Sequence, residues 1–167
     1  MTELDDPKRV LAELLNDEWD ASNTLGVTPE IRTGWRDSDL PAPQVTVGTD
    51  EESPITPTGF SGMSGSGGGP TATIRGTVQV NTWVSREVTD ENPKQLSSEV
   101  SKEIKRVVRE NLNPSTHAFG ISGLTAENYR YISWLGREFL PTEPSENESP
   151  VVYRYLCEIR YEYLDEP

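Results

Sequence analysis

The chain has 167 residues, of which 28 are Asp or Glu and 15 are Lys or Arg, and its formal net charge at pH 7 is −13. This length suits one domain with a modest core, because only 33% of the residues are hydrophobic. The negative charge argues against specific nucleic-acid binding, which needs a basic footprint, and against docking on anionic membranes.

The N-terminal segment predicts an amphipathic helix over about residues 7–19. Asp6 followed by Pro7 is a helix start signal. Apolar residues then recur at helical spacing, namely Val10, Leu11, Leu14, Leu15 and Trp19. The acidic stretch before the helix has no apolar run and predicts no signal peptide. No segment reaches the roughly 18 apolar residues that a membrane span needs.

The next segment alternates between irregular chain and strands. Residues 20–42 have no sustained period and are predicted to be irregular, with Ile31 and Trp35 anchoring them to the body. Residues 44–47 predict a short strand. A long strand follows the next loop, with these residues on its apolar face: Ile74, Val78, Val80, Thr82 and Val84. Gly76 interrupts this strand, which suggests a β-bulge.

A loop predicted at about residues 50–70 separates these two strands. Its Gly/Ser-rich part at 61–70 is typical of flexible coil. Two interpretations stay open, a tolerated insertion or a loop that orders only against a partner. In the second case, Phe60 and Met63 are candidate anchors. No Gly-Lys-Ser/Thr motif closes the loop, which argues against a phosphate-binding loop.

A second helix is predicted over about residues 93–112. The stretch Asn92-Pro93-Lys94-Gln95 resembles a capping box. The apolar stripe comprises Leu96, Val100, Ile104, Val107 and Val108. The outer face carries a basic island on an acidic protein, with Lys102, Lys105, Arg106 and Arg109. This face is either a solvated helix surface or a contact for an acidic neighbour, such as another copy of the chain.

Two further strands, at residues 129–135 and 151–163, predict a terminal β-hairpin. The last strand alternates over thirteen residues, roughly 43 Å of chain, which is about as long as a compact domain of this size. Arg154 and Arg160 lie on its polar face, and Cys157 lies on its apolar face as a buried hydrophobe rather than a reactive thiol. We therefore expect a single α+β domain, with a mostly antiparallel sheet of long strands flanked by two amphipathic helices.

No residue pattern in the chain predicts catalysis. His117 is the only histidine and Cys157 the only cysteine, and forty residues and a hairpin separate them. A metal site built on His and Cys needs more ligands than the chain contains. The acidic clusters lack the spaced Asp/Asn/Gly pattern of a calcium loop. We expect no enzymatic activity, no metal and no cofactor.

The order of helix, short strand, long loop, long strand, helix and terminal hairpin resembles tail terminator proteins. These ring-forming proteins cap the tail tube of long-tailed viruses. The resemblance is one of layout, and it runs from the helix at Val10–Trp19 to the strand at Val151–Tyr163. It implies a homohexameric ring with a lumen that DNA can pass through, and contacts with the tail tube protein and neck or connector proteins. It also implies location in the virion tail and neck, after assembly in the host cytoplasm.

The basic residues comprise 4 Lys and 11 Arg. An acid-rich, Lys-poor surface suits concentrated salt, because salt screens self-repulsion. We interpret this as a virus of a halophilic archaeon; an acidic mesophilic protein is the alternative. Other functions left open are a head-tail connector, stopper or minor tail protein, a halophilic cytoplasmic binding module, and an enzyme with carboxylate-only chemistry. Candidate partner contacts are Phe60, Met63, Lys102, Lys105, Arg106, Arg109, Arg154 and Arg160.

Overall fold

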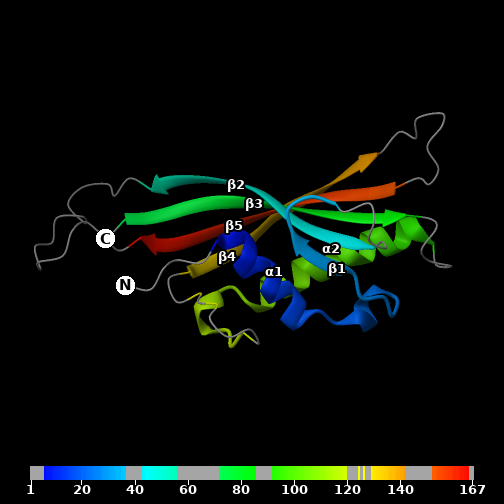
Figure 1. The fold of residues 1–167 in the computed structure, drawn as a ribbon, viewed down its shortest axis with the longest axis horizontal. Coiled ribbons are helices and arrows are strands. Elements are labelled where there is room, and N and C mark those ends of the chain that lie inside the picture. The colour runs from blue at the N-terminus through cyan, green and yellow to red at the C-terminus, as the bar shows by residue number, and fades with distance from the viewer. Residues whose placement is uncertain are drawn as a thin grey trace, which may run out of the picture.

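The chain folds into two layers, a five-stranded β-sheet and two α-helices that cover one of its faces (Figure 1). The computed structural model describes residues 6–36, 43–55, 72–85, 92–119, 124, 126, 129–141 and 152–165. The predicted fold class is confirmed: the protein is a single-domain α+β structure with a mostly antiparallel sheet. We call the two sides of the sheet the covered face, which meets the helices, and the open face.

The sheet has the strand order β1-β2-β3-β5-β4. The strands are β1 (Glu30–Thr33), β2 (Gln44–Ile55), β3 (Ala72–Ser85), β4 (Tyr129–Pro141) and β5 (Val152–Asp165). Only β1 and β2 are parallel, and every other neighbouring pair is antiparallel. The central strand β3 pairs with both β2 and β5, so that Val80 lies opposite Val47 on one side and Cys157 on the other.

Both predicted helices are present and begin at the predicted caps. Helix α1 spans Pro7–Glu18 and α2 spans Pro93–Glu110. The Asp6 carboxylate accepts a hydrogen bond from the Lys8 amide at 2.8 Å. Asn92 accepts from the amides of Lys94 and Gln95 at 3.1 and 3.4 Å. Two short 3₁₀ turns follow the helices, η1 (Ala21–Thr24) after α1 and η3 (Pro114–Thr116) after α2.

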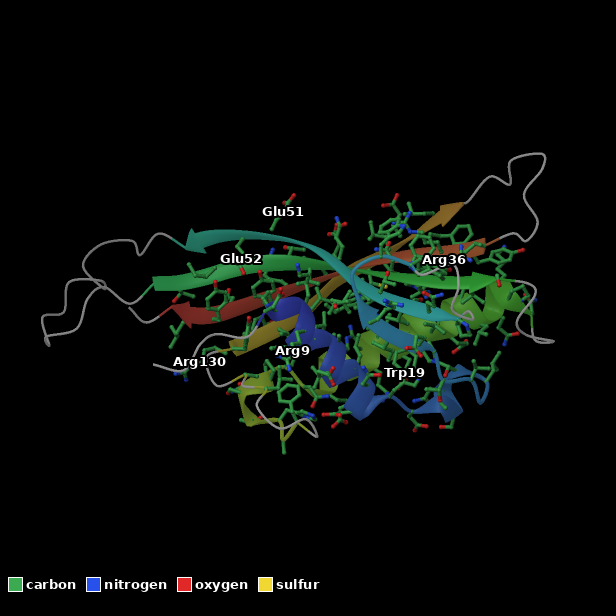
Figure 2. The ribbon with its side chains drawn as sticks, viewed as in Figure 1. Arg9, Trp19, Arg36, Glu51, Glu52 and Arg130 are labelled. Carbon is green, nitrogen blue, oxygen red and sulfur yellow. The ribbon has the colours of Figure 1, made fainter. Side chains whose placement is uncertain are left out.

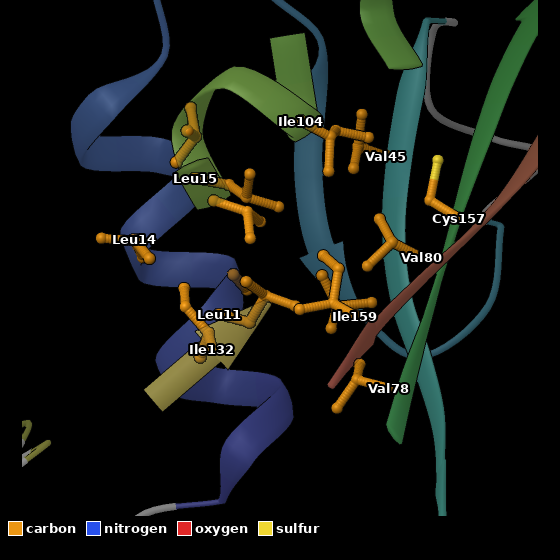
Figure 3. Packing of buried hydrophobic residues seen from close by; sticks show 14 of the residues in the cluster. Leu11, Leu14, Leu15, Val45, Val78, Val80, Ile104, Ile132, Cys157 and Ile159 are labelled. Atoms are coloured by element: carbon orange, nitrogen blue, oxygen red, sulfur yellow. The ribbon is translucent and has the colours of Figure 1, made fainter. Parts of the chain in front are cut away.

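One apolar core fills the space between the helices and the covered face (Figure 3). Leu14, Leu15 and Ile104 come from the helices, and Val80 and Ile159 come from the sheet; all five are buried. Burying one such side chain contributes about 1.5–3 kcal/mol. Cys157 belongs to the same core, as its place in the alternating strand predicts. Burial raises the pKa of its thiol to about 12, so the group stays protonated and behaves as a small hydrophobe.

Strand β2 is longer than the sequence predicts. The predicted strand at 44–47 continues to Ile55 across an irregularity between Gly48 and Asp50. The polar and acidic residues after Gly48 have low strand propensity, but they pair in register with β3, and this pairing overrides local preference. Residues 50–55, predicted as part of a loop, are therefore strand. The predicted irregular segment 20–42 likewise contains η1 and β1.

The β-bulge suggested at Gly76 is wrong. Strand β3 pairs with β5 without a register shift, and Gly76 lies opposite Tyr161. A Cβ atom at Gly76 would lie 2.3 Å from Cζ and from the hydroxyl oxygen of Tyr161. Glycine is needed at this position because the Tyr161 ring lies across the backbone. The irregularities occur instead in β2 and at two places in β4, near Arg130 and near Leu135.

Candidate interaction surfaces

Arg106, predicted as a partner contact, is bound within the chain. Glu103 of α2 is only 1% exposed, and its carboxylate accepts hydrogen bonds from the Asp20 amide at 3.0 Å and from Asn23 Nδ2 at 2.9 Å. Arg106 Nε donates to both carboxylate oxygens of Glu103 at 3.0 and 2.9 Å. A further donor of Arg106 reaches the carbonyl of Glu18 at 2.7 Å. The hydrogen bond that Arg106 donates to Glu103 raises the pKa of Arg106, and this network joins α2 to the end of α1.

The solvent side of α2 carries the other predicted cations. We call Lys94, Lys102, Lys105 and Arg109 the basic stripe. Lys102 forms an ion pair with Glu99 at 3.4 Å. Lys94, Lys105 and Arg109 have no ion pair with any residue that the structure describes. The basic stripe therefore contains three cations that are available to a neighbouring molecule.

Strand β4 forms one edge of the sheet and lies next to the basic stripe. Arg137 of β4 donates to the carbonyl oxygen of Ser98 at 3.1 Å. Ser98 is on the same side of α2 as Lys94 and Lys102, which lie four residues before and after it. Three large hydrophobic residues of this edge are exposed, namely Tyr131, Leu135 and Phe139. Apolar groups and free cations thus occupy one side of the molecule.

The open face carries charged residues along β3 and β5. Arg75 and Glu162 form an ion pair at 2.6 Å across these strands. Arg160 is half-buried on this face and has no ion pair among the described residues. Arg154 lies on the same face nearer the β1 end of the sheet, opposite Trp83. Figure 2 labels Arg36 toward this end, and Glu51 and Glu52 toward the other.

Two tryptophans and two arginines pack together on the open face, and we call Trp35, Arg36, Trp83 and Arg154 the arginine–tryptophan cluster. The rings of Trp35 and Trp83 meet edge to face, with centroids 5.1 Å apart. The Arg154 guanidinium lies 4.7 Å from the Trp83 ring and 5.3 Å from the Trp35 ring. Arg36 lies 5.9 Å from the Trp83 ring. Desolvation lowers the pKa of Arg154 from its ordinary value, although an arginine remains charged.

Sequence reasoning placed Arg154 on the polar face of the last strand but did not bring it together with Trp83. The missing information was the register of β3 against β5, which pairs these two residues directly. Trp35 was predicted to anchor its segment to the body. It does contact the sheet through Trp83, yet 62% of its surface is exposed. Ile31 is the buried anchor of β1.

The tyrosine-rich end of β5 has a structural explanation. The hydroxyls of Tyr161 and Tyr163 donate to the two carboxylate oxygens of Glu52 at 2.5 and 3.1 Å. The Tyr129 ring lies 5.4 Å from the Tyr163 ring. These contacts fasten β2, β4 and β5 together at the end of the sheet where β2 extends beyond β1. Phe60, Met63 and the Gly/Ser-rich stretch at 61–70 lie outside the described residues.

His117 and Cys157 occupy different environments. His117 Nε2 lies 3.3 Å from Asp17 and its Nδ1 lies 3.5 Å from Glu18, both at the end of α1, whereas Cys157 is in the core. Within the described ranges, no group of three or more His, Cys, Asp or Glu side chains could hold a metal ion. No helix in those ranges is long and apolar enough to cross a membrane.

The fold and these surfaces define a class of protein by geometry: a small α+β domain with one helix-covered sheet face, one open face, and edge strands β1 and β4. In comparisons with known proteins, no family model matches the chain and no curated protein matches it.

Proposed function

We propose that this chain is a structural virion protein of the tail-terminator type, which forms a ring that caps a tail tube and joins it to the neck. The observation that carries the proposal is the composition of the β4 side of the molecule. That side combines an edge strand, exposed hydrophobic residues and the cations of the basic stripe that have no ion pair among the described residues. The long strands and the two helices agree with the layout that the sequence resembles.

An exposed edge strand supports association with another chain. Its backbone groups can pair with a strand or loop of a neighbour, and natural proteins usually shield such an edge. In β4 the Ile132 amide is already used, because it donates to the Leu112 carbonyl at 2.8 Å. Leu135 and Phe139 lie farther along the strand, where no other strand among the described residues pairs with its outer edge. This part of β4 is the section best suited to a contact with a neighbour.

The charges of the chain support another copy of the same chain as the neighbour. Each copy has 28 acidic and 15 basic residues, so acidic groups outnumber cations in every copy. Lys105 and Arg109 on one copy would therefore meet carboxylates on the next. Two different surfaces in contact form a heterologous interface, which closes into a ring when the rotation between copies allows it.

The net charge of −13 also supports the proposal that the protein assembles in concentrated salt. In a ring the copies repel one another through their net charge, and salt weakens this repulsion. The Debye length falls from about 10 Å at 0.1 M to about 3 Å at 1 M. We therefore place the protein in a virus of a halophilic archaeon and expect its assembly to need concentrated salt.

The test is the mass and shape of the purified full-length chain in about 1 M and about 0.1 M KCl, a range over which screening changes strongly. Light scattering gives the mass, and negative-stain electron microscopy gives the shape. We expect rings in concentrated salt and smaller species in dilute salt. A particle of 18.6 kDa in both buffers, with no ring after mixing with purified tail tubes, would contradict the proposal.

A monomeric binding module is the second candidate, and the arginine–tryptophan cluster is the feature that favours it. Trp35 is mostly exposed and packs against Trp83 of the sheet, as expected of a residue that binds a partner. The same measurement separates the two candidates. A binding module stays at the mass of one chain at every salt concentration and does not attach to the end of a tube.

A further inference from the structure

We propose that the arginine–tryptophan cluster is a docking site for an extended, acidic segment of a partner protein. In this proposal the carboxylates of the segment pair with Arg36 and Arg154, while its apolar side chains lie against Trp35. The proposal is independent of ring formation, because the cluster is on the open face and the basic stripe is on α2.

The first argument is charge. The chain contains 28 acidic residues, yet neither Arg36 nor Arg154 forms an ion pair with any carboxylate in the described ranges. Arg36 Nε is buried and has no hydrogen-bond partner there. Buried polar groups are normally hydrogen-bonded, and an unpaired one lowers stability. A carboxylate from a partner would supply the ion pair that both guanidinium groups lack.

The second argument is the fixed orientation of Arg154. Its Nε and Nη2 atoms donate to Asn81 Oδ1 at 2.9 and 2.6 Å, and its plane lies against two indole rings. Trp83 is itself held by a hydrogen bond from its Nε1 to Thr46 Oγ1 at 2.9 Å. The side chain of Arg154 is therefore ordered before a partner arrives. A guanidinium has five N–H donors, so donors remain for a carboxylate.

The third argument is the contrast between the two tryptophans. Trp83 is 6% exposed and forms the floor of the cluster, whereas Trp35 is 62% exposed and stands above it. Tryptophan and arginine are the residue types most often found at the energetic centre of protein interfaces. An exposed indole beside two cations offers apolar contact and charge together, which suits a segment that alternates carboxylates with hydrophobic residues.

The surroundings leave room for a segment rather than for a single side chain. A depression of about 610 Å³ borders Trp35 on the side of α1. Its lining includes Thr33 of β1 together with Lys8 and Arg9 of α1 and the cap residue Asp6, whose carboxylate lies 3.7 Å from Lys8 Nζ. An extended chain that pairs with Arg154 could continue past Trp35 into this depression.

The test is a titration of the ¹⁵N-labelled full-length chain with a capped Glu-Leu-Glu-Leu-Glu peptide, followed by NMR. The reporters are the indole N–H of Trp35 and the Nε–H of Arg154. We expect both signals to shift in a saturable way. Arg36→Gln should weaken binding about tenfold, which corresponds to 1.4 kcal/mol. Arg160→Gln is the matched control, because it removes the same charge from the same face away from the tryptophans, and it should bind like the wild type.

Several results would overturn the proposal. Equal binding of a capped Gln-Leu-Gln-Leu-Gln peptide would show that carboxylates are not recognised. Equal shifts with acetate at the same carboxylate concentration would show that no segment is needed. Shifts that depend on protein concentration without any peptide would identify a second copy as the occupant. If Arg36→Gln alters the amide spectrum broadly, Trp35→Ala replaces it as the variant that must weaken binding. The results with the peptides and with acetate do not depend on whether the chain forms rings.

Discussion

The covered and open faces of the sheet are organised by different interactions. On the covered face, Val80 and Ile159 are buried under helices and form part of one apolar core. On the open face, Trp83 packs against two arginines and another tryptophan and donates a hydrogen bond to Thr46. The covered face depends on the hydrophobic effect, which needs only shape and apolar character. The open face depends on specific polar contacts. One of its donors, Nε of Arg36, has no hydrogen-bond partner within the described residues. The first arrangement specifies a fold, and the second is suited to recognition.

The largest loss of stability is expected at Glu103, the buried carboxylate of α2 that contacts the end of α1. Glu103→Gln removes the charge that pairs with Arg106 and one acceptor of the network. Breaking such a pair by removing one partner should lower the free energy of unfolding by about 3 kcal/mol. Glu99→Gln is the control, because it removes the exposed pair with Lys102 and should change stability by about 0.5 kcal/mol or less. Urea denaturation measures both. Equal losses would mean that burial of Glu103 has no special role.

A smaller loss is expected at the contact between Gly76 and Tyr161. Gly76→Ala places a methyl group where the Tyr161 ring lies, and this ring is held by its hydrogen bond to Glu52. Overpacking of this kind lowers stability by about 1–3 kcal/mol. Thermal denaturation in a Tyr161→Val background is the control, because the ring is then absent and the alanine should be tolerated. The same loss in both backgrounds would rule out the steric explanation.

Much of the covered face could be predicted from the sequence. The alternation of β5 and the caps at Asp6 and Asn92 depend on local patterns that tertiary structure did not override. Glu103 was missed, although it stands three residues after Val100 on the apolar stripe of α2, which was a readable signal of burial.

The remaining features depend on contacts between residues that are far apart in the sequence. The acidic second half of β2 is a strand because β3 pairs with it, and the irregularity near Leu135 hides the full length of β4. The arginine–tryptophan cluster requires the register of β3 and β5, and also the return of Trp35 over the open face. Single-residue patterns contain none of these long-range relations.

The smallest effect on stability is expected on the open face. Trp35→Ala removes an exposed ring and its contacts with Trp83 and Arg154, which should lower stability by about 0.5–1 kcal/mol. Trp35→Phe keeps an aromatic ring over the cluster and should retain most of this energy. Chemical denaturation measures both variants. A loss for Trp35→Ala as large as that for Glu103→Gln would show that the open face stabilises the fold as strongly as the covered face does.

The central claim, that copies associate through the β4 and α2 side, is tested most directly by reversing the free charges of the basic stripe. Lys105→Glu combined with Arg109→Glu should leave the fold intact, because neither residue forms an ion pair within the described chain. Lys105→Arg combined with Arg109→Lys is the matched control that keeps both charges. In light scattering at about 1 M KCl, where exposed charges still interact over about 3 Å, the wild type and the control should form rings. The reversed variant should remain at 18.6 kDa, and in dilute salt, where the wild type does not form rings, it should have the melting temperature of the wild type. Rings formed equally well by the reversed variant would contradict the claim.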